Sequence, residues 1–142
     1  MAVTVTTEFV GLKEANAALR RLPEFARDDA QQVMDATASA IARQATSSAP
    51  GREPTPRHGV HLKDAIAWKR RRFGAVVGVD PRAFHWKFFE YGTKFMPARP
   101  MFRPAADAQR TLHQREMENA LERASNKMAA SQAGFGFGAH AR

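Results

Sequence analysis

Residues 84–105 read FHWKFFEYGTKFMPARPMFRPA and contain seven of the thirteen aromatic residues in this chain. Four basic side chains lie among the rings, at positions 87, 94, 99 and 103. Aromatic side chains favour burial whereas Lys and Arg favour water, so the segment is too aromatic for an ordinary loop and too charged for an ordinary core. We therefore predict that it forms a surface that another molecule covers.

The first half of this segment has the spacing of a helix. Phe84 and Phe88 are four residues apart and Tyr91 follows three residues later, which places the three rings on one helical face. Gly92 suits the left-handed backbone that ends a helix. We predict a short aromatic helix over residues 83–91 that is closed by Gly92 and Thr93.

The second half of the segment contains prolines at positions 97, 100 and 104. Each proline prevents a continuous helix, because it lacks the amide hydrogen that a helix interior uses. Pro is tolerated in a first helical turn, so Pro104 predicts the start of the final helix. Residues 94–103 are then predicted to form a stiff, exposed connector.

The final helix is predicted over residues 104–128. Its apolar positions recur at helical spacing apart from one five-residue step, which predicts that the face drifts or that the helix bends. These positions are Ala105, Ala108, Leu112, Met117, Leu121, Ala124 and Met128. Residues 129–142, AASQAGFGFGAHAR, are low in complexity and predict a flexible tail.

Three elements are predicted at the start of the chain. Residues 3–9 alternate β-branched residues in the manner of a strand, and residues 12–22 have the period of a short amphipathic helix. A long helix is predicted to begin at Pro23 and to stop within residues 47–50. Its inward face consists mostly of small residues, which let a partner element approach closely: Ala26, Ala30, Val33, Thr37, Ile41 and Ala45.

A loop and a hairpin are predicted between the long helix and the aromatic segment. Residues 47–59, SSAPGREPTPRHG, predict a long loop, and residues 61–65 predict a helical turn. Residues 66–72 and 75–79 predict two strands joined at Phe73 and Gly74. Trp68 should then share a face with Ile66, while Lys69 and Arg71 point to the other face.

Together these elements predict an α+β fold, in which a small antiparallel or mixed sheet packs against a long N-terminal helix and a C-terminal helix. The length of 142 residues fits one domain. We assign residues 1–128 to that domain and residues 129–142 to the tail.

The composition excludes several classes of protein. The chain has no cysteine, so disulfide scaffolds, thiolate metal sites and cysteine nucleophiles are excluded. No stretch approaches the roughly 18 consecutive apolar residues that a membrane span needs. We therefore expect no membrane partner.

The net charge of +8 lies in the middle of the chain. Residues 52–103 hold twelve Lys or Arg against four acidic residues, whereas the remainder is balanced. Such a field favours a polyanion or an acidic protein surface, and a solvated basic face is the alternative. The candidate contacts are Arg52, Arg57, Lys69, Arg70, Arg71 and Arg72.

No motif for catalysis or for a cofactor is present. The chain lacks a G-x-S-x-G elbow, and its densest glycines lie in the tail, with no strand before them. His58 and His61 have metal-ligand spacing, but Gly59 disfavours a helix there and no third ligand is marked. We predict no enzyme activity, no metal and no cofactor.

The aromatic segment resembles the signature of the HK97 gp10-like family of tailed-phage proteins. The matching residues are the tetrapeptide Glu90, Tyr91, Gly92 and Thr93, followed by the start of the last helix at residues 100–105. The long helix, the Pro-rich loop, the segment HLKDAIAWKR and the strand ending in VVGVD also follow the order of that family. The resemblance covers roughly residues 5–125, and Met101 is a small departure because it precedes the aromatic residue.

The resemblance implies a structural virion protein that assembles in the cytoplasm of a bacterial host. It implies a ring, commonly hexameric, that terminates the tail tube and joins it to the head connector or stopper. DNA that passes through the lumen of the ring is a further possible partner. The residues expected to contact a neighbouring subunit or ring are Phe84, Trp86, Phe88, Glu90, Tyr91, Gly92, Thr93, Lys94, Phe95, Met96, Pro100, Phe102, Arg103 and Pro104.

The residues themselves leave a second interpretation open. Basic residues interleaved with aromatic rings suit single-stranded nucleic acid, because bases stack on the rings and phosphates pair with Lys or Arg. The alternative is therefore a small nucleic-acid-binding protein that uses the hairpin at 69–72 and the nearby rings.

Overall fold

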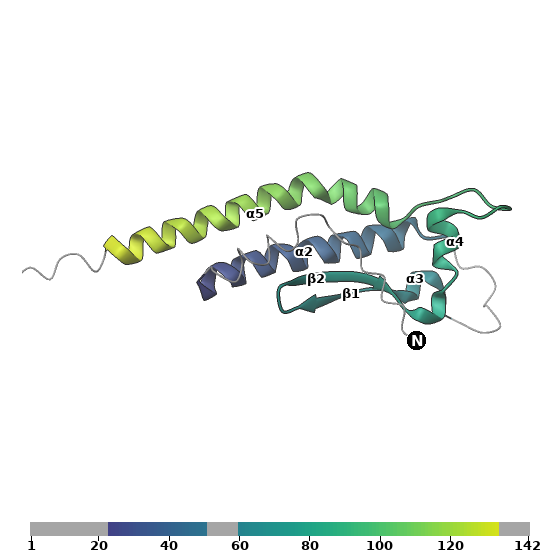
Figure 1. Cartoon of the computed structure of the whole chain (residues 1–142), viewed down its shortest axis with the longest axis horizontal. Coiled ribbons are helices and arrows are strands. Elements are labelled where there is room, and N and C mark those ends of the chain that lie inside the picture. The colour runs from purple at the N-terminus through teal and green to yellow at the C-terminus, as the bar shows by residue number, and fades with distance from the viewer. Residues whose placement is uncertain (1–22, 51–59, 134–142) are drawn as a thin grey trace, which may run out of the picture.

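A computed structural model describes residues 23–50 and 60–133. The strand expected at 3–9, the helix expected at 12–22, residues 51–59 of the predicted loop and residues 134–142 of the predicted tail lie outside these described residues. The predicted α+β class is confirmed (Figure 1). The elements are α2 (Glu24–Ser48), α3 (Leu62–Ala65), β1 (Ile66–Arg71), β2 (Gly74–Val79), the 3-10 turn η1 (Pro81–Ala83), α4 (Trp86–Tyr91) and α5 (Phe102–Ala133).

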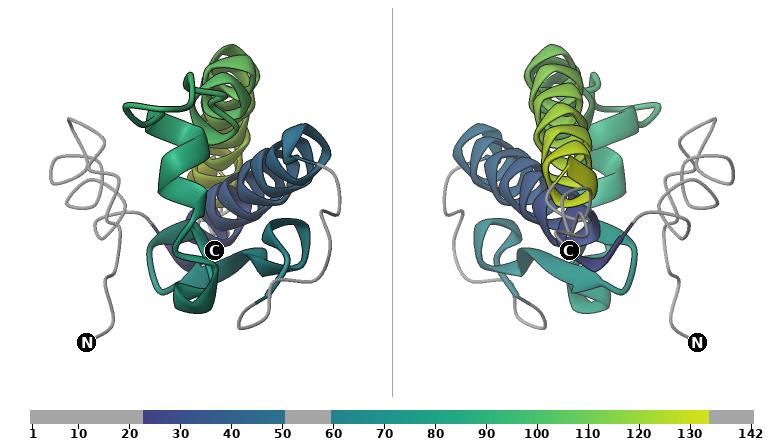
Figure 2. Two further views of the ribbon diagram at one scale, coloured as in Figure 1. Left: turned by 90° about the vertical axis from the view of Figure 1, so that its right-hand side faces the viewer. Right: turned by 90° about the vertical axis from the view of Figure 1, so that its left-hand side faces the viewer.

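The two long helices α2 and α5 form an antiparallel pair (Figures 1 and 2). Thr37 Oγ1 of α2 lies 2.8 Å from His113 Nδ1 of α5, and Lys127 Nζ lies 3.2 Å from an oxygen of Asp29. Alanine dominates the buried positions of both helices, as in Ala30 and Ala120. Short side chains allow the two backbones to approach closely, as predicted for a face of small residues. Of the predicted positions, Ala26, Ala30 and Ala45 are buried and the other three are half-buried.

The end points of α2 are close to those predicted. Pro23 precedes the helix as its N-cap residue rather than occupying the first helical position, and α2 ends at Ser48 within the predicted stop. Ala49 then has an extended backbone, and its N–H donates to the carbonyl oxygen of Thr46.

The inward face of α5 differs from the predicted one. Leu112 and Leu121 are 52% and 43% exposed, whereas Ala120 is buried and His113 is half-buried. The prediction took the leucines as markers of the core, but α2 offers an alanine surface against which only short or flat side chains of α5 fit. The buried face of α5 is therefore rotated relative to the predicted one, and Ala108, Leu112 and Leu121 lie outside it.

The helix α5 is also longer than predicted at both ends. It begins at Phe102, so Pro104 lies inside the first turn, and it continues to Ala133. Residues 129–133 are therefore helical and do not belong to a tail. In Figure 1, α5 extends past the first turn of α2.

The predicted hairpin is confirmed: β1 and β2 are antiparallel, with register from Ile66↔Val79 to Arg71↔Gly74. Gly74 opens β2 instead of lying in the turn. Two side chains of α2 fix the hairpin: Gln31 bonds both the N–H and the C=O of Gly74, and Asp35 accepts from Arg70 Nε at 2.6 Å. The helix α2 thus lies between α5 and the hairpin (Figure 2).

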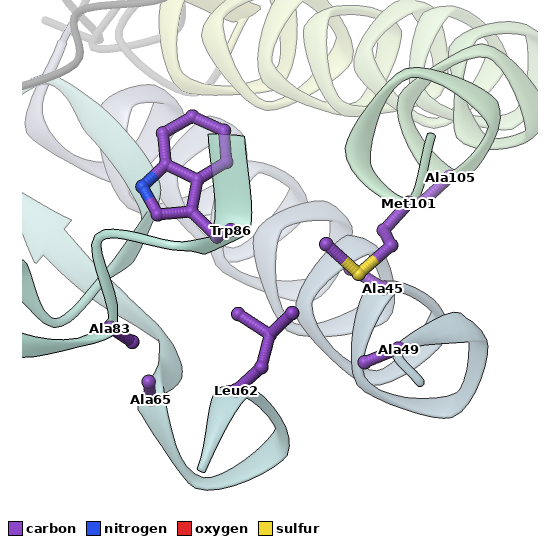
Figure 3. Close-up of a cluster of buried hydrophobic side chains, with 8 residues drawn as sticks. All are labelled: Ala45, Ala49, Leu62, Ala65, Ala83, Trp86, Met101 and Ala105. Carbon is purple, nitrogen blue, oxygen red and sulfur yellow. The ribbon is translucent and has the colours of Figure 1, made fainter. Parts of the chain in front are cut away.

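The main cluster of buried apolar residues lies where α2 ends and α5 begins (Figure 3). Met101 and Trp86 are its large members, and alanines of α2, α3, η1 and α5 surround them. Trp86 of α4 belongs to this cluster, so the aromatic segment is anchored in the buried core. Among the described helices, none is both long and apolar enough to cross a membrane.

Candidate interaction surface

The aromatic segment begins with a fixed turn. Asp80 Oδ1 accepts the N–H of Arg82 at 2.9 Å, and the Arg82 guanidinium lies 2.8 Å from Asp80 Oδ2. The side-chain hydrogen bond from Arg82 lowers the pKa of Asp80 to about 2. Pro81 starts η1, and the buried Ala83 anchors it against the core cluster. The direction in which α4 leaves the hairpin is set by this turn.

The helix α4 separates its rings into an inner and an outer set. Trp86 is buried and packs edge-on against Phe102, with ring centroids 5.7 Å apart. The helix begins at Trp86, later than the predicted start at residue 83, so Phe84 lies in the turn before it. Phe84 is 63% exposed, and on the outer side of α4 Phe88 is 45% and Tyr91 66% exposed. Phe84 and Phe88 form a T-shaped pair at 6.2 Å, as their four-residue spacing predicts.

Gly92 ends α4 with a backbone that other residues rarely adopt. Its φ of 74° and ψ of 174° lie in a region that is essentially restricted to glycine. A Cβ atom at this position would lie 2.8 Å from the backbone nitrogen of Ala98. Gly92 therefore ends the helix as predicted, although its ψ differs from that of the predicted left-handed backbone. The glycine also permits a close approach of the returning chain.

Residues 93–96 form a tight turn at the end of the molecule. Thr93 N–H donates to Met96 O at 2.8 Å, and Thr93 Oγ1 accepts the N–H groups of Phe95 and Met96 at 3.2 and 3.1 Å. Phe95 at the tip is 92% exposed, with Lys94 Nζ 5.9 Å from its ring centroid. The turn therefore displays an aromatic ring on a backbone that is already ordered.

Glu90 holds the base of this loop and was missed as a structural residue by sequence reasoning. Its buried carboxylate accepts the N–H groups of Met101, Phe102 and Arg103 at 2.7, 3.1 and 3.1 Å. A helix start has N–H groups without partners inside the helix, and a carboxylate there satisfies them and complements the helix dipole. Glu90 thereby caps α5 from a different helix.

A second bond ties the two ends of the loop together, since Arg99 N–H donates to Phe89 O at 2.6 Å. In the sequence, the only indication of these two contacts is an acidic residue at the end of an aromatic helix, followed by a connector that contains prolines. That signal does not identify the partner, because Glu90 and Met101 are eleven residues apart.

The predicted contact residues therefore fall into three groups by exposure. Trp86 and Glu90 are buried and hold the segment in place. Gly92, Met96 and Phe102 are partly buried. The exposed residues are Phe84, Phe88, Tyr91, Thr93, Lys94, Phe95, Pro100, Arg103 and Pro104. We define the aromatic surface as Phe84, Phe88, Tyr91 and Phe95.

The basic run at 69–72 is divided between two faces of the hairpin. Arg70 points to α2 and forms an ion pair with Asp35, whose side chain is only 11% exposed. Lys69, Arg71 and Arg72 are exposed, and the guanidinium of Arg72 lies 5.2 Å from the Phe73 ring centroid. Arg52 and Arg57 lie outside the described residues.

A comparison with protein-family models gives one match, described as "Bacteriophage HK97-gp10, putative tail-component", over residues 13–92. The match spans more than half of the chain. The chain belongs to this family. The predicted resemblance is confirmed, and the protein is a structural phage component of the virion tail. Searches of curated proteins and of solved structures gave no match.

The family match covers α2, the hairpin and α4, and it ends at Gly92. The turn at 93–96 and α5 lie beyond the matched residues, so their roles rest on the geometry above. Within residues 23–50 and 60–133, no group of three His, Asp or Glu side chains is placed to hold a metal ion.

Proposed function

We propose that this protein is a ring-forming subunit at the head–tail joint of a tailed phage. The ring terminates the tail tube and connects it to the head connector or stopper, and it performs no catalysis. The observation that carries the proposal is the aromatic surface, which a member of a phage tail family displays at one end of its fold.

The exposure of these rings supports a protein contact. Aromatic residues are enriched at the centres of interfaces, where they bury a large area at a small cost in side-chain freedom. Phe95 is 92% exposed on a turn that Thr93 already orders, so its burial costs little further entropy. A ring subunit needs two unlike surfaces, and the aromatic surface supplies one of them.

The partners in this proposal are a neighbouring copy of the chain, the tail tube protein and the head connector. Assembly takes place in the cytoplasm of the bacterial host. The exposed aromatic surface pairs with the neighbouring copy, and the opposite ends of the ring meet the tube and the connector.

The test is assembly of the purified protein, followed by light scattering, electron microscopy and co-sedimentation with tail tubes. The proposal expects closed rings, either alone or on the ends of tubes. A protein that stays monomeric at high concentration and does not bind tubes contradicts it.

A second candidate function is supported by Lys69, Arg71 and Arg72, which are exposed beside one another on the hairpin. These cations suit phosphate contacts, either in a nucleic-acid-binding protein or with DNA in the ring lumen. Titration with DNA and RNA at several salt concentrations tests it. Phosphate contacts give a steep log–log slope of affinity against salt, and binding that does not saturate rejects the idea.

A further inference from the structure

An open groove of about 470 Å³ lies between α2 and the start of the hairpin. Four of its lining residues on α2 follow the first one by three, four, seven and eight positions, so all five occupy one helical face: Ser39, Ala42, Arg43, Thr46 and Ser47. The other wall consists of Lys63, Ile66, Ala67 and Trp68. The groove is distinct from the aromatic surface, because no residue of α4 or of the 93–96 turn lines it.

The groove follows the edge of β1. Ile66 and Trp68 point to one face of the strand and Ala67 to the other, so a groove that all three line must run along the strand edge. In the described part of the sheet, β1 has β2 as its neighbour on one side and no strand on its other side. An unpaired edge of this kind can accept an extended peptide.

The groove is positively charged. Arg43 and Lys63 line it, and none of its described lining residues is acidic. Among the described residues, the ion pairs involve Arg70, Arg82, Arg110 and Lys127, not these two cations. Their charges are therefore available to carboxylates of a partner.

The groove also offers apolar contact. Trp68 is 37% exposed there, and Ile66 and Ala42 lie in the same lining. A large apolar side chain beside two cations suits a segment that alternates acidic and apolar residues. A DNA duplex would instead contact the exposed cations Lys69, Arg71 and Arg72, because phosphate contacts do not need an apolar surface such as Trp68.

We propose that this groove binds an extended acidic segment of a partner protein, which pairs its carboxylates with Arg43 and Lys63 and packs an apolar side chain on Trp68. The site is a second interaction surface, in addition to the aromatic surface. It does not depend on ring formation, because a single copy contains all the residues named.

The experiment uses the full chain and a short fluorescein-labelled peptide in which glutamate alternates with leucine. Binding is followed by anisotropy and by tryptophan emission, which shifts to shorter wavelength when the exposed ring of Trp68 is covered. The other tryptophan, Trp86, is already buried. The double variant Arg43→Glu/Lys63→Glu should weaken binding about tenfold or more, because it places like charges opposite the peptide.

The matched control is Lys69→Glu/Arg71→Glu, which makes the same change of charge on the opposite face of β1. It should change the affinity less than about threefold, through the general field alone. Far-UV circular dichroism establishes that both variants are folded. Ring assembly of the groove variant should be normal, so failure of this inference and failure of the proposed function give different results.

Three results would overturn the inference. The first is that folded wild-type protein does not bind the peptide. The second is an equal loss of affinity in the two double variants. The third is that a competitor displaces the peptide and has a higher affinity for the groove than the peptide has. The competitors to test are a single-stranded oligonucleotide and a second copy of the chain at high concentration.

Discussion

The aromatic end of the molecule and the hairpin are both exposed, but they are held in different ways. At the aromatic end, backbone N–H groups converge on the buried carboxylate of Glu90. The hairpin is held by two side chains of α2, Gln31 and Asp35. The first region displays rings and the second displays cations.

This difference in how the two regions are held indicates which of them is specialised for a stable contact. Exposed rings are costly in water and are kept rigid here, whereas exposed cations are well solvated and need little support. We therefore expect the aromatic surface to depend on its internal hydrogen bonds, and the basic side of the hairpin to depend on them much less.

The largest expected effect on stability is that of Glu90→Ala. Three N–H groups at the start of α5 lose their acceptor in a mostly buried site, so the free energy of unfolding should fall by about 3 kcal/mol. Urea denaturation measures this change. The control is Glu118→Ala on the exposed side of α5, which should stay within about 0.5 kcal/mol of the wild type. Equal effects of the two substitutions would show that Glu90 does not hold the loop.

A smaller loss is expected for Gly92→Ala. The φ of 74° disfavours a side chain, and the added Cβ would meet the backbone of Ala98, so a loss of about 2 kcal/mol is expected. The control is Gly78→Ala, where an added Cβ meets nothing within 4 Å. Thermal melts of the two variants should differ clearly, and indistinguishable melts would contradict the assigned turn geometry.

At the hairpin, Asp35→Ala removes the acceptor of Arg70 and a hydrogen-bond partner of Gln31. Because the Arg70 side chain is 64% exposed and can be solvated, the loss should be only about 1 kcal/mol. A loss larger than that of Glu90→Ala would reverse the comparison between the two regions. Chemical denaturation under the same conditions decides the order.

Both regions are attached to the pair of helices α2 and α5. The stability of this pair should depend weakly on pH. Burial lowers the pKa of His113 below its ordinary value of 6.5, so the folded state prefers the neutral ring. As the pH falls through 6.5, His113 takes up a proton in the unfolded chain before it does so in the folded protein. Protonation therefore favours the unfolded chain, and the free energy of unfolding decreases. Urea denaturation at pH 7.5 and 5.5 should therefore show a lower free energy of unfolding at pH 5.5. His113→Gln should flatten this profile, and an unchanged profile would assign it to other groups.

The sequence predicted the parts of the molecule that depend on local spacing. Phe84, Phe88 and Gly92 identify the aromatic helix and its end, and Phe73 and Gly74 locate the hairpin, because these signals lie within a few residues of one another. The turn itself is one residue earlier than predicted, at Arg72 and Phe73. The contacts that join distant segments were not predictable. Glu90 reaches α5 across eleven residues, and the Asp35–Arg70 pair spans thirty-five. Likewise, the face of α5 was misplaced because its partner is an alanine surface, which only the tertiary structure reveals.

The most direct test of the central claim is the assembly of a Phe95→Ala variant. Phe95 is 92% exposed, so its removal should leave the free energy of unfolding within about 0.5 kcal/mol of the wild type. Light scattering and electron microscopy should nevertheless show loss of rings, whereas the exposed control Leu112→Ala should assemble normally. Normal ring assembly and completion of phage particles by Phe95→Ala would contradict the account.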